Sequence, residues 1–368
     1  MMTDTKERGR LVYLAEPERI EYREYDLPEI EPGGILAAVV RANVCGSELH
    51  IWRGFHPTVK QCVLGHEMVG RVHSLGAGVT TDYAGQPMAV GDRIVACYFL
   101  TCRKCRACRH GQFNLCENAY RFWMQHPDTA PHFHGTFGTH YCIHPDQYVY
   151  KVPESVPDSI ASFANCALSQ VYYGLDAATL TADETVVLQG AGGLGLSAIA
   201  VAKERGARVI AIDGVGYRLE AALAFGADEI VDMREYTAPE ARIAEVLRLT
   251  EGWGADVGME LTGVPDAFNE GLGCVRPGGR YVSIGNVSPG QLTQFDPGLL
   301  NRRAIQIIPV IRYQPWYLLK SLRLLATTQG RYPWTSLVDQ DFAFDDVDNA
   351  LLRSERREVR RASIVIGK

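Results

Sequence analysis

The sequence predicts an α/β protein with a doubly wound parallel sheet in its second half and a barrel-like, β-rich domain in its first. From about residue 185 onward, short β-branched runs alternate with helical stretches, and a glycine-rich turn joins the first run to the first helix. The first ~155 residues lack this alternation and show short strands broken by Gly and Pro. With 368 residues, the chain is long enough for two domains.

The composition is that of an ordinary globular protein, with 46% hydrophobic and 22% charged residues. It excludes a largely disordered chain, a coiled coil and a small disulfide-stapled protein. The net charge of −6 argues against general electrostatic binding to nucleic acid or to anionic lipid. No apolar run approaches the ~20 residues that cross a bilayer, and the N-terminus lacks the apolar core of a secretory signal. We therefore expect a soluble, cytoplasmic protein.

Within the first part, Ile35–Arg41 and Arg93–Ala96 read as short strands of the barrel-like domain. Two residues near these strands suit a metal ion, because Cys45 offers a thiolate and His66, 21 residues later, offers an imidazole. Cys166 would add a third ligand and leave the fourth position to water or substrate, which is the pattern of a catalytic zinc. Each residue alone has a plainer interpretation, and spacing alone does not join Cys166 to the other two.

Four of the ten cysteines form a C-x2-C-x2-C-x7-C run, at Cys102, Cys105, Cys108 and Cys116. This spacing lets one loop wrap a tetrahedral zinc ion in a closed site that supports folding and does no chemistry. An iron–sulfur cluster is disfavoured because such loops usually have proline after the fourth cysteine, where Glu117 stands. A nucleic-acid-binding zinc ribbon is disfavoured by the acidic chain. We predict a structural zinc.

Residues 120–144 contain five of the ten histidines, which are His126, His132, His134, His140 and His144. A third metal site is one interpretation of this segment. It is disfavoured because the segment lies between two zinc elements that need no further ligands. We favour a solvated loop or the rim of a pocket. With Phe122, Trp123, Phe133 and Phe137 nearby, the segment could shape a pocket for a bulky substrate.

The second part opens on a phosphate-binding turn. Thr185–Gln189 reads as a buried parallel strand, Leu196–Arg205 reads as a helix, and a G-x-G-x-x-G motif joins them. Glycine lets the backbone approach a pyrophosphate, and the helix N-terminus offers free N–H groups. This context predicts a dinucleotide-binding Rossmann domain. The expected cofactor contacts in the turn are Gly190, Gly192, Gly193, Leu194 and Gly195.

An acidic residue follows the second strand, Arg208–Ile212. Asp213 lies 23 positions after Gly190, close to the ~20 typical of this fold. A carboxylate there can hold both hydroxyls of the adenosine ribose and would repel a 2′-phosphate, which favours NAD over NADP. Arg218 could reach such a phosphate or stack on adenine, so NADP stays open.

The alternation of strand and helix continues to about residue 310. The expected elements are a strand at Glu229–Asp232, a helix near Glu240–Thr250, a strand at Ala255–Glu260, a helix from Pro265, and strands at Arg280–Gly285 and Ala304–Ile308. Together these six strands complete a doubly wound sheet. From about residue 311 the chain reads as a helix near Trp316–Thr327 and then a closing strand, Arg361–Ile366.

The segment Gly65–Gly70, followed by Gly76 and Val79, resembles the complete zinc signature of the zinc-dependent medium-chain alcohol dehydrogenases. The four-cysteine lobe also lies where that family has its structural zinc, and the resemblance covers essentially the whole chain. It implies a GroES-like catalytic domain made of residues 1–157 and 311–368, and a Rossmann domain of residues 158–310. The active site would lie in the cleft between these domains, and the protein would be a homodimer or homotetramer.

The resemblance also implies roles for individual residues. The catalytic zinc would be bound by Cys45, His66 and Cys166, with Glu67 as a second carboxylate that can replace water on the metal. Ser47 and His50 would form a proton relay, whereas spacing alone would favour a helix cap and an exposed histidine. The nicotinamide side of the cofactor would be lined by Thr262, Gly263, Ile284 and Gly285.

These features predict a dehydrogenase with two zinc ions that oxidises an alcohol, secondary or cyclic, to a ketone or aldehyde with NAD. A zinc-independent enone or quinone reductase of the same superfamily is disfavoured because such enzymes usually lack the Cys45–His66 pair and the four-cysteine lobe. A non-enzymatic binding scaffold is disfavoured because the open metal site and the cofactor turn are both intact. Aromatic residues such as Trp52, Phe55, Trp123 and Tyr313 could line the substrate pocket, without fixing the substrate.

Overall fold

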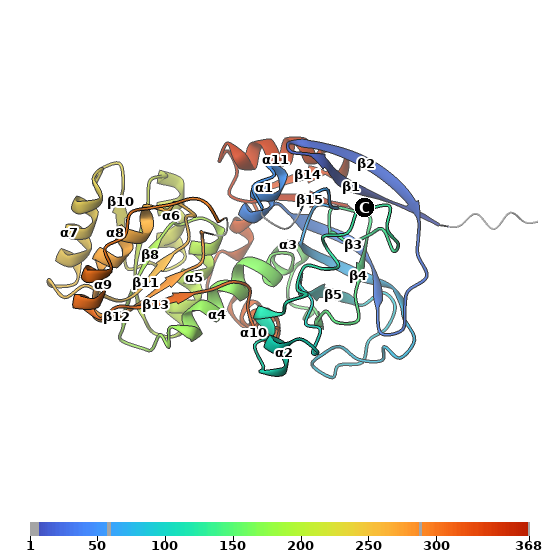
Figure 1. Ribbon diagram of the computed structural model, residues 1–368, viewed down its shortest axis with the longest axis horizontal. Coiled ribbons are helices and arrows are strands. Elements are labelled where there is room, and N and C mark those ends of the chain that lie inside the picture. Colours follow the sequence, from blue (N-terminus) through green and yellow to red (C-terminus); the bar gives the residue numbers. More distant parts are fainter. Residues whose placement is uncertain (1–6, 57–59, 287–288, 367–368) are drawn as a thin grey trace, which may run out of the picture. The chain divides into compact units, whose positions relative to one another are not determined.

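The computed structural model describes residues 7–56, 60–286 and 289–366, which form two compact units (Figure 1). Unit 1 comprises Met1–Cys166, Gln314–Gln329 and Trp334–Lys368, and unit 2 comprises Ala167–Tyr313 and Gly330–Pro333. Unit 1 is therefore discontinuous in sequence, since most of the C-terminal segment folds with the N-terminal one.

Unit 1 is built on a seven-stranded sheet and a separate two-stranded hairpin. The hairpin joins β1 (Arg8–Glu16) to β2 (Arg19–Asp26). The large sheet contains β14 (Gln340–Ala343), β15 (Ala362–Val365), β3 (Ile35–Asn43), β4 (Glu67–Leu75), β5 (Arg93–Ala96) and β7 (Val149–Lys151) in this order, and β6 (His140–Ile143) pairs with β3. All pairs are antiparallel except β14 with β15. The buried apolar residues of these strands form two clusters, a larger one that includes Val12, Val39 and Ile364 and a smaller one that includes Leu11 and Leu36.

Short helices complete unit 1. They are α1 (Gly46–Trp52), α2 (Arg106–Arg109), α3 (Asp158–Ala161), α10 (Trp316–Thr328) and α11 (Val347–Glu355), with single turns at Phe113–Leu115, Trp334–Leu337 and Phe344–Asp346. A π-helical turn, η2 (Ala164–Leu168), contains the last residues of unit 1 before the chain enters unit 2. Such turns are rare and occur often at functional sites.

Unit 2 is a doubly wound sheet, as the sequence predicts. Its strands are β8 (Thr185–Gln189), β9 (Arg208–Asp213), β10 (Glu229–Asp232), β11 (Ala255–Glu260), β12 (Val275–Ser283) and β13 (Gln306–Pro309). They are all parallel and lie in the order β10-β9-β8-β11-β12-β13, so the chain reverses direction across the sheet beside β8. The connecting helices are α4 (Ser169–Ala177), α5 (Gly193–Glu204), α6 (Gly216–Ala224), α7 (Pro239–Leu249), α8 (Ala267–Cys274) and α9 (Pro297–Arg303).

Several element boundaries in unit 2 differ from the sequence expectation; strand β12, for example, begins at Val275 rather than Arg280. Two of the differences arise at helix ends. Helix α5 begins at Gly193 rather than Leu196, so the glycines of the turn form its first residues. Strand β13 begins at Gln306 because Ala304 has a left-handed backbone (φ 50°) that ends α9. Both differences come from backbone conformation at a helix end, which the apolar pattern does not report.

The histidine-rich segment is less solvated than we expected. His134 and His140 are buried, and the His134 ring packs edge-on against Phe122 with 4.7 Å between ring centroids. His132 stacks on Tyr25, at 4.3 Å, and the ring of His126 is 5.0 Å from that of Tyr13. The segment therefore packs against the β1–β2 hairpin.

Replacing His134 with leucine tests how this buried imidazole changes the free energy of unfolding with pH. Burial lowers the pKa of His134 to about 4, whereas an exposed imidazole has a pKa of about 6.5. Between these values the unfolded chain binds more protons than the folded one, so the free energy of unfolding falls as the pH decreases. We expect His134→Leu to flatten this dependence by up to ~1.4 kcal/mol per pH unit, measured by urea denaturation at a series of pH values.

His126→Leu is the matched control, because its imidazole is 42% exposed. The slope of its unfolding free energy against pH is the reference for the slope of His134→Leu. If the free energy of unfolding changes equally with pH in the parent and in His134→Leu, burial does not lower the pKa of His134.

Candidate functional site

Unit 1 contains a buried cluster of four side chains that could hold a metal ion, which are Cys45, His66, Glu67 and Cys166. One potential ligand atom from each lies within 4.8 Å of the others, and all four residues are buried. The two sulfur atoms are 3.8 Å apart, although 121 residues separate them in the sequence. The fold thus brings Cys166 to the pair that spacing alone left apart from it.

Three backbone segments position these side chains. Cys45 directly precedes α1 as its N-cap residue, and His66 directly precedes β4, whose first residue is Glu67. Cys166 lies in the π-helical turn η2. The side chain of Asn165 connects this turn to the sheet, because its Nδ2 donates hydrogen bonds to the carbonyl oxygens of His66 (2.8 Å) and Ala96 (2.9 Å).

Glu48 orients the His66 ring. Its Oε2 is 2.8 Å from His66 Nδ1, and its Oε1 accepts a hydrogen bond of 3.0 Å from the backbone N–H of Gly65. The carboxylate is fully buried. Since Nδ1 donates to Glu48, Nε2 keeps its lone pair for a metal, which is the usual arrangement around a metal-binding histidine.

Of the two carboxylate oxygens of Glu67, one accepts hydrogen bonds and the other does not. Oε2 accepts hydrogen bonds from Arg361 and from Asn43 Nδ2, the latter at 3.3 Å. Oε1 is buried and has no hydrogen-bond partner among the described residues. Burial raises the pKa of Glu67 to about 7, and Arg361 opposes that rise. A buried oxygen without a partner is costly, and a cation beside it would satisfy it.

The thiols and the nearby hydroxyl also suit a cation. A hydrogen bond from Cys166 and the proximity of His66 lower the pKa of Cys45 well below the usual range, so Cys45 is available as a thiolate ligand. Ser47 Oγ donates to Cys45 Sγ at 3.4 Å and lies 3.3 Å from His66 Nε2. Two sulfurs, one imidazole nitrogen and a carboxylate fit zinc, and the hydroxyl of Ser47 lies directly beside them.

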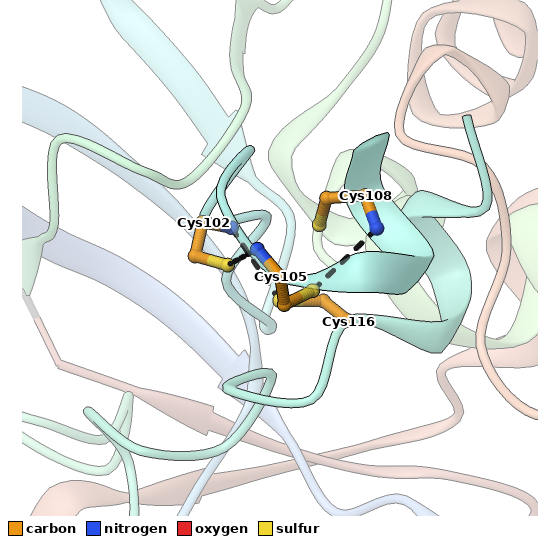
Figure 2. A group of neighbouring side chains, drawn as sticks. All are labelled: Cys102, Cys105, Cys108 and Cys116. Atoms are coloured by element: carbon orange, nitrogen blue, oxygen red, sulfur yellow. Dashed lines mark hydrogen bonds between the residues drawn. The ribbon is translucent and has the colours of Figure 1, made fainter. Parts of the chain in front are cut away.

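The second cluster consists of four sulfur ligands from one loop, Cys102, Cys105, Cys108 and Cys116 (Figure 2). Backbone N–H groups within the loop point at the sulfurs, as from Cys105 to Cys102 (3.3 Å) and from Cys102 to Cys116 (3.4 Å). Although burial raises the pKa of Cys102, hydrogen bonds from the backbone N–H groups of Cys105 and Lys104 and from the Asn118 side chain lower it to about 6. Four converging sulfurs with N–H donors fit a closed zinc site.

The glycine turn of unit 2 has the close backbone packing that its motif predicts. Gly190 has a φ of 100°, and a Cβ on Gly195 would lie 2.0 Å from the Gly190 carbonyl oxygen. Gly192 is the N-cap residue of α5, and a Cβ there would meet no atom of the described residues within 4 Å. The N-terminus of α5 is therefore open to an anionic ligand.

Asp213 is the last residue of β9, and its side chain is hydrogen-bonded to the glycine turn. Its Oδ2 accepts a hydrogen bond from the Ala191 N–H (2.7 Å), and its Oδ1 accepts one from the Val215 N–H (2.9 Å). Arg218 Nη1 is 3.9 Å from Oδ2. The acidic residue and the arginine that the sequence analysis singled out are thus neighbours at the end of the same strand.

A buried carboxylate organises the other side of this sheet edge. Glu260, at the end of β11, accepts hydrogen bonds through Oε1 from the backbone N–H groups of Thr262 (2.6 Å) and Gly263 (2.7 Å). Through Oε2 it accepts one from the Gly285 N–H (3.0 Å). Glu260 therefore joins the two segments that the resemblance assigns to the nicotinamide side, at Thr262–Gly263 and Ile284–Gly285.

Known proteins are similar to this chain over most of its length. Residues 31–154 match the alcohol dehydrogenase GroES-like domain, and residues 193–327 match the zinc-binding dehydrogenase family. 5-exo-hydroxycamphor dehydrogenase of Pseudomonas putida is 33% identical over 93% of this chain and 94% of its own length. The chain belongs to the zinc-dependent medium-chain alcohol dehydrogenases.

Further relatives agree with this assignment. L-threonine 3-dehydrogenase of Pyrococcus horikoshii is 33% identical to this dehydrogenase over 82% of the chain and 83% of its own length. The crystal structure of an alcohol dehydrogenase from Thermotoga maritima superposes with a TM-score of 0.91 at 29% identity, covering 98% of this chain and 99% of that one. Among the described residues, no helix is both long and apolar enough to cross a membrane.

Sequence reasoning did not identify three charged residues of this dehydrogenase that hold the sites together, which are Glu48, Glu260 and Arg361. One signal was available for Glu48, because it shares a face of α1 with the buried Ile51 and Trp52 at helical spacing. A charge on an apolar face indicates a buried partner. Arg361 lies 294 residues from Glu67, and no local pattern connects them.

Replacing Glu48 with glutamine tests its role in orienting His66. We expect Glu48→Gln to weaken zinc binding at the Cys45–His66–Cys166 cluster by about 10–100-fold, because partners of this kind have effects of that size. Zinc release to a chelator, followed with a colorimetric indicator, should then show one fast-releasing site and one unchanged site.

Glu154→Gln, at an exposed position, is the control and should release zinc as the parent does. Identical release curves for the parent and Glu48→Gln would show that Glu48 does not position the ligand.

Proposed function

We propose that this chain catalyses hydride transfer between a secondary or cyclic alcohol and NAD, producing a ketone, with one catalytic and one structural zinc. The observation that carries the proposal is the buried donor set beside Ser47: two thiols, an imidazole and a carboxylate oxygen that lacks a partner among the described residues. In this proposal unit 1 is the catalytic domain and unit 2 binds the cofactor.

The geometry of the two clusters supports the proposed metal ligands. Cys45, His66 and Cys166 would hold the catalytic zinc, with Glu67 in reach of it, and the four-cysteine loop would hold the structural zinc. A zinc ion in the first cluster supplies Lewis acidity, which lowers the pKa of an alcohol toward neutrality. In the second cluster the four sulfurs would supply all the ligands of a zinc ion and leave no open position, so that ion would have a structural role.

The residues of α1 provide a path for the alcohol proton. Ser47 Oγ, next to Cys45 Sγ and His66 Nε2, accepts the proton from the substrate hydroxyl. His50 lies three residues further along α1, on the same face, and receives the proton from this hydroxyl on its way to solvent. Burial lowers the pKa of His50, so its ring is neutral and able to accept a proton at neutral pH.

Aromatic rings beside the metal ligands favour an apolar, ring-shaped substrate. The rings of Tyr98 and Trp123 each lie 5.2 Å from the His66 ring, and Tyr120 lies 6.0 Å from Trp123. Trp123 Nε1 donates to the Val63 carbonyl oxygen at 3.0 Å, which fixes the indole. These flat surfaces can pack against a cyclic alcohol.

The relatives support the same substrate class. The hydroxyl group of 5-exo-hydroxycamphor and the hydroxyl on carbon 3 of threonine, which the names of the two curated relatives specify, are both secondary. A cyclic substrate is favoured over an amino acid because Tyr98 and Trp123 place aromatic rings beside His66.

NAD is favoured over NADP by the charge at the end of β9. Asp213 presents a carboxylate beside the open N-terminus of α5, where it can bind ribose hydroxyls and repel a 2′-phosphate. Arg218, 3.9 Å away, is partly neutralised by Asp213 and is less available to a phosphate. Assembly as a homodimer or homotetramer in the cytoplasm completes the proposal and rests on the family resemblance.

Steady-state turnover with a series of alcohols tests the reaction and the relay. We expect NAD-dependent oxidation of cyclic secondary alcohols, followed by NADH absorbance, and a loss of kcat of about 10²–10⁴-fold in Ser47→Ala, because that is the usual contribution of a positioned proton acceptor. Zinc content must be measured alongside, since Ser47 contacts two metal ligands.

Ser155→Ala, at an exposed position, should retain parent activity. Unchanged kcat in zinc-loaded Ser47→Ala would remove Ser47 from the relay. A fully active protein without zinc would overturn the proposed function.

The cofactor preference is tested at Asp213. We expect Asp213→Ser to lower kcat/KM for NAD by about 10–100-fold, the usual worth of hydrogen bonds to a charged group, and to raise it for NADP. The ratio of the two kcat/KM values is the measurement. Arg218→Leu in the same background should reduce the gain with NADP. A parent enzyme that prefers NADP, or an Asp213→Ser variant with an unchanged ratio, would contradict the cofactor assignment.

A further inference from the structure

Unit 1 contains a third group of metal-binding side chains, apart from the two cysteine clusters. Glu7, His73 and His140 each place one potential ligand atom within 4.8 Å of the others. The two imidazole rings are perpendicular with 5.1 Å between centroids, and Glu7 Oε2 is 3.7 Å from His73 Nε2. The residues come from distant parts of the sequence, so the sheet brings them together.

The sheet presents His73 through a β-bulge. Strand β3 pairs with β4 on one side and with β6 on the other, and His140 lies on β6 opposite Ala38. In the β3–β4 pairing, Leu36 is opposite Ser74 and Ala37 is opposite Val72, so His73 has no opposite residue. Bulges of this kind redirect a side chain and occur often at functional sites.

Hydrogen bonds select the nitrogen of His140 that is available to a metal. Thr139 Oγ1 accepts a hydrogen bond from the Arg10 N–H (2.9 Å), donates to the Arg10 carbonyl oxygen (3.3 Å) and lies 3.0 Å from His140 Nδ1. A hydroxyl has one proton, so His140 Nδ1–H must be the donor to Thr139. His140 Nε2 then carries the free lone pair, as in metal-binding histidines with a fixed second partner.

Glu7 can complete the ligand set from the surface. Its backbone is held at the start of the hairpin, because its carbonyl oxygen accepts a hydrogen bond from the Leu27 N–H (2.8 Å), while its side chain is 65% exposed and free to adjust. Glu7 and His73 line a surface groove of about 590 Å³ that also contains Asp26 and Glu29. The nearby cation Arg8 is paired with Glu24 and Asp26, so the groove favours a cation.

We propose that Glu7, His73 and His140 bind a third metal ion, a divalent first-row transition metal such as zinc, through two imidazole nitrogens and one carboxylate oxygen. Ligands around a tetrahedral zinc lie ~3.3 Å apart, given bonds of ~2.0–2.1 Å. A small movement of the exposed Glu7 side chain closes the present separation. Imidazole ligands exclude calcium and magnesium, which prefer oxygen. The bound metal links the start of β1 to β4 and β6 and leaves a coordination position open to water.

Titration of the zinc-loaded full chain with Co²⁺ distinguishes this site from the cysteine clusters. We expect one further equivalent of Co²⁺ to bind and to produce d–d absorption without a thiolate-to-cobalt charge-transfer band, because the proposed ligands contain no sulfur. Absence of a third equivalent, or absorption that always includes thiolate charge transfer, would overturn the proposal, since the latter indicates exchange at the cysteine sites.

Variants identify the ligands. His73→Ala and His140→Ala should each weaken Co²⁺ binding by about 100-fold or more, since loss of a supporting partner alone costs 10–100-fold. Glu7→Gln, at an exposed position that cannot disturb the core, should weaken it as well. His132→Ala is the matched control, because His132 lines the same groove outside the cluster. Equal binding by His132→Ala and Glu7→Gln would overturn the ligand assignment.

Thr139 provides a test of positioning. Thr139→Val removes the acceptor of the His140 Nδ1–H and should weaken Co²⁺ binding by about 10–100-fold, whereas Thr139→Ser keeps the hydroxyl and should bind as the parent does. Metal binding should also raise the melting temperature of the zinc-loaded parent, but not of His73→Ala, because the ion binds only the folded chain. Weak binding by both Thr139 variants would show that the hydroxyl does not position His140.

Discussion

Buried charge is the constraint on which the architecture of unit 1 depends. Four ionisable side chains meet away from water around His66 and Glu67, in surroundings where an unpaired charge is strongly unfavourable. The chain supplies a partner for each of these two residues, with Glu48 beside His66 and Arg361 beside Glu67. Removing either partner would leave a buried charged group without compensation. Glu67 Oε1 already lacks a hydrogen-bond partner among the described residues, and a metal ion can satisfy it.

The course of the C-terminal segment follows from this electrostatic requirement. Arg361 directly precedes β15, and β15 pairs with β3 so that Ser363 lies opposite Asn43. Asn43 in turn donates from Nδ2 to Glu67 and to Ser162. The last strand of the described residues therefore lies beside Glu67. The discontinuity of unit 1 and the neutralisation of its buried carboxylate are two aspects of one arrangement.

The sequence predicts the parts of the structure that depend on neighbouring residues. Strand β8 (Thr185–Gln189) lies where its apolar run indicates, because both faces of a central parallel strand are covered. The four-cysteine loop is equally local, since its four cysteines lie within 15 residues of the sequence and the N–H donors to their sulfurs come from the same loop. Helix α5 begins earlier than predicted because the glycines that weaken a helix elsewhere are required where backbone N–H groups face a phosphate.

Partners that come from distant segments could not be predicted, because a local pattern does not state what a side chain will face. Glu260 reads as the end of a strand, yet its two oxygens hold the loops after β11 and β12 together. The partner of His140 likewise comes from a distant segment. Its neighbours in the sequence point only to one histidine-rich segment, whereas the fold places His140 beside His73, since β4 and β6 flank the same strand. Proximity in the sheet, rather than in the sequence, determines which ligands can share a metal.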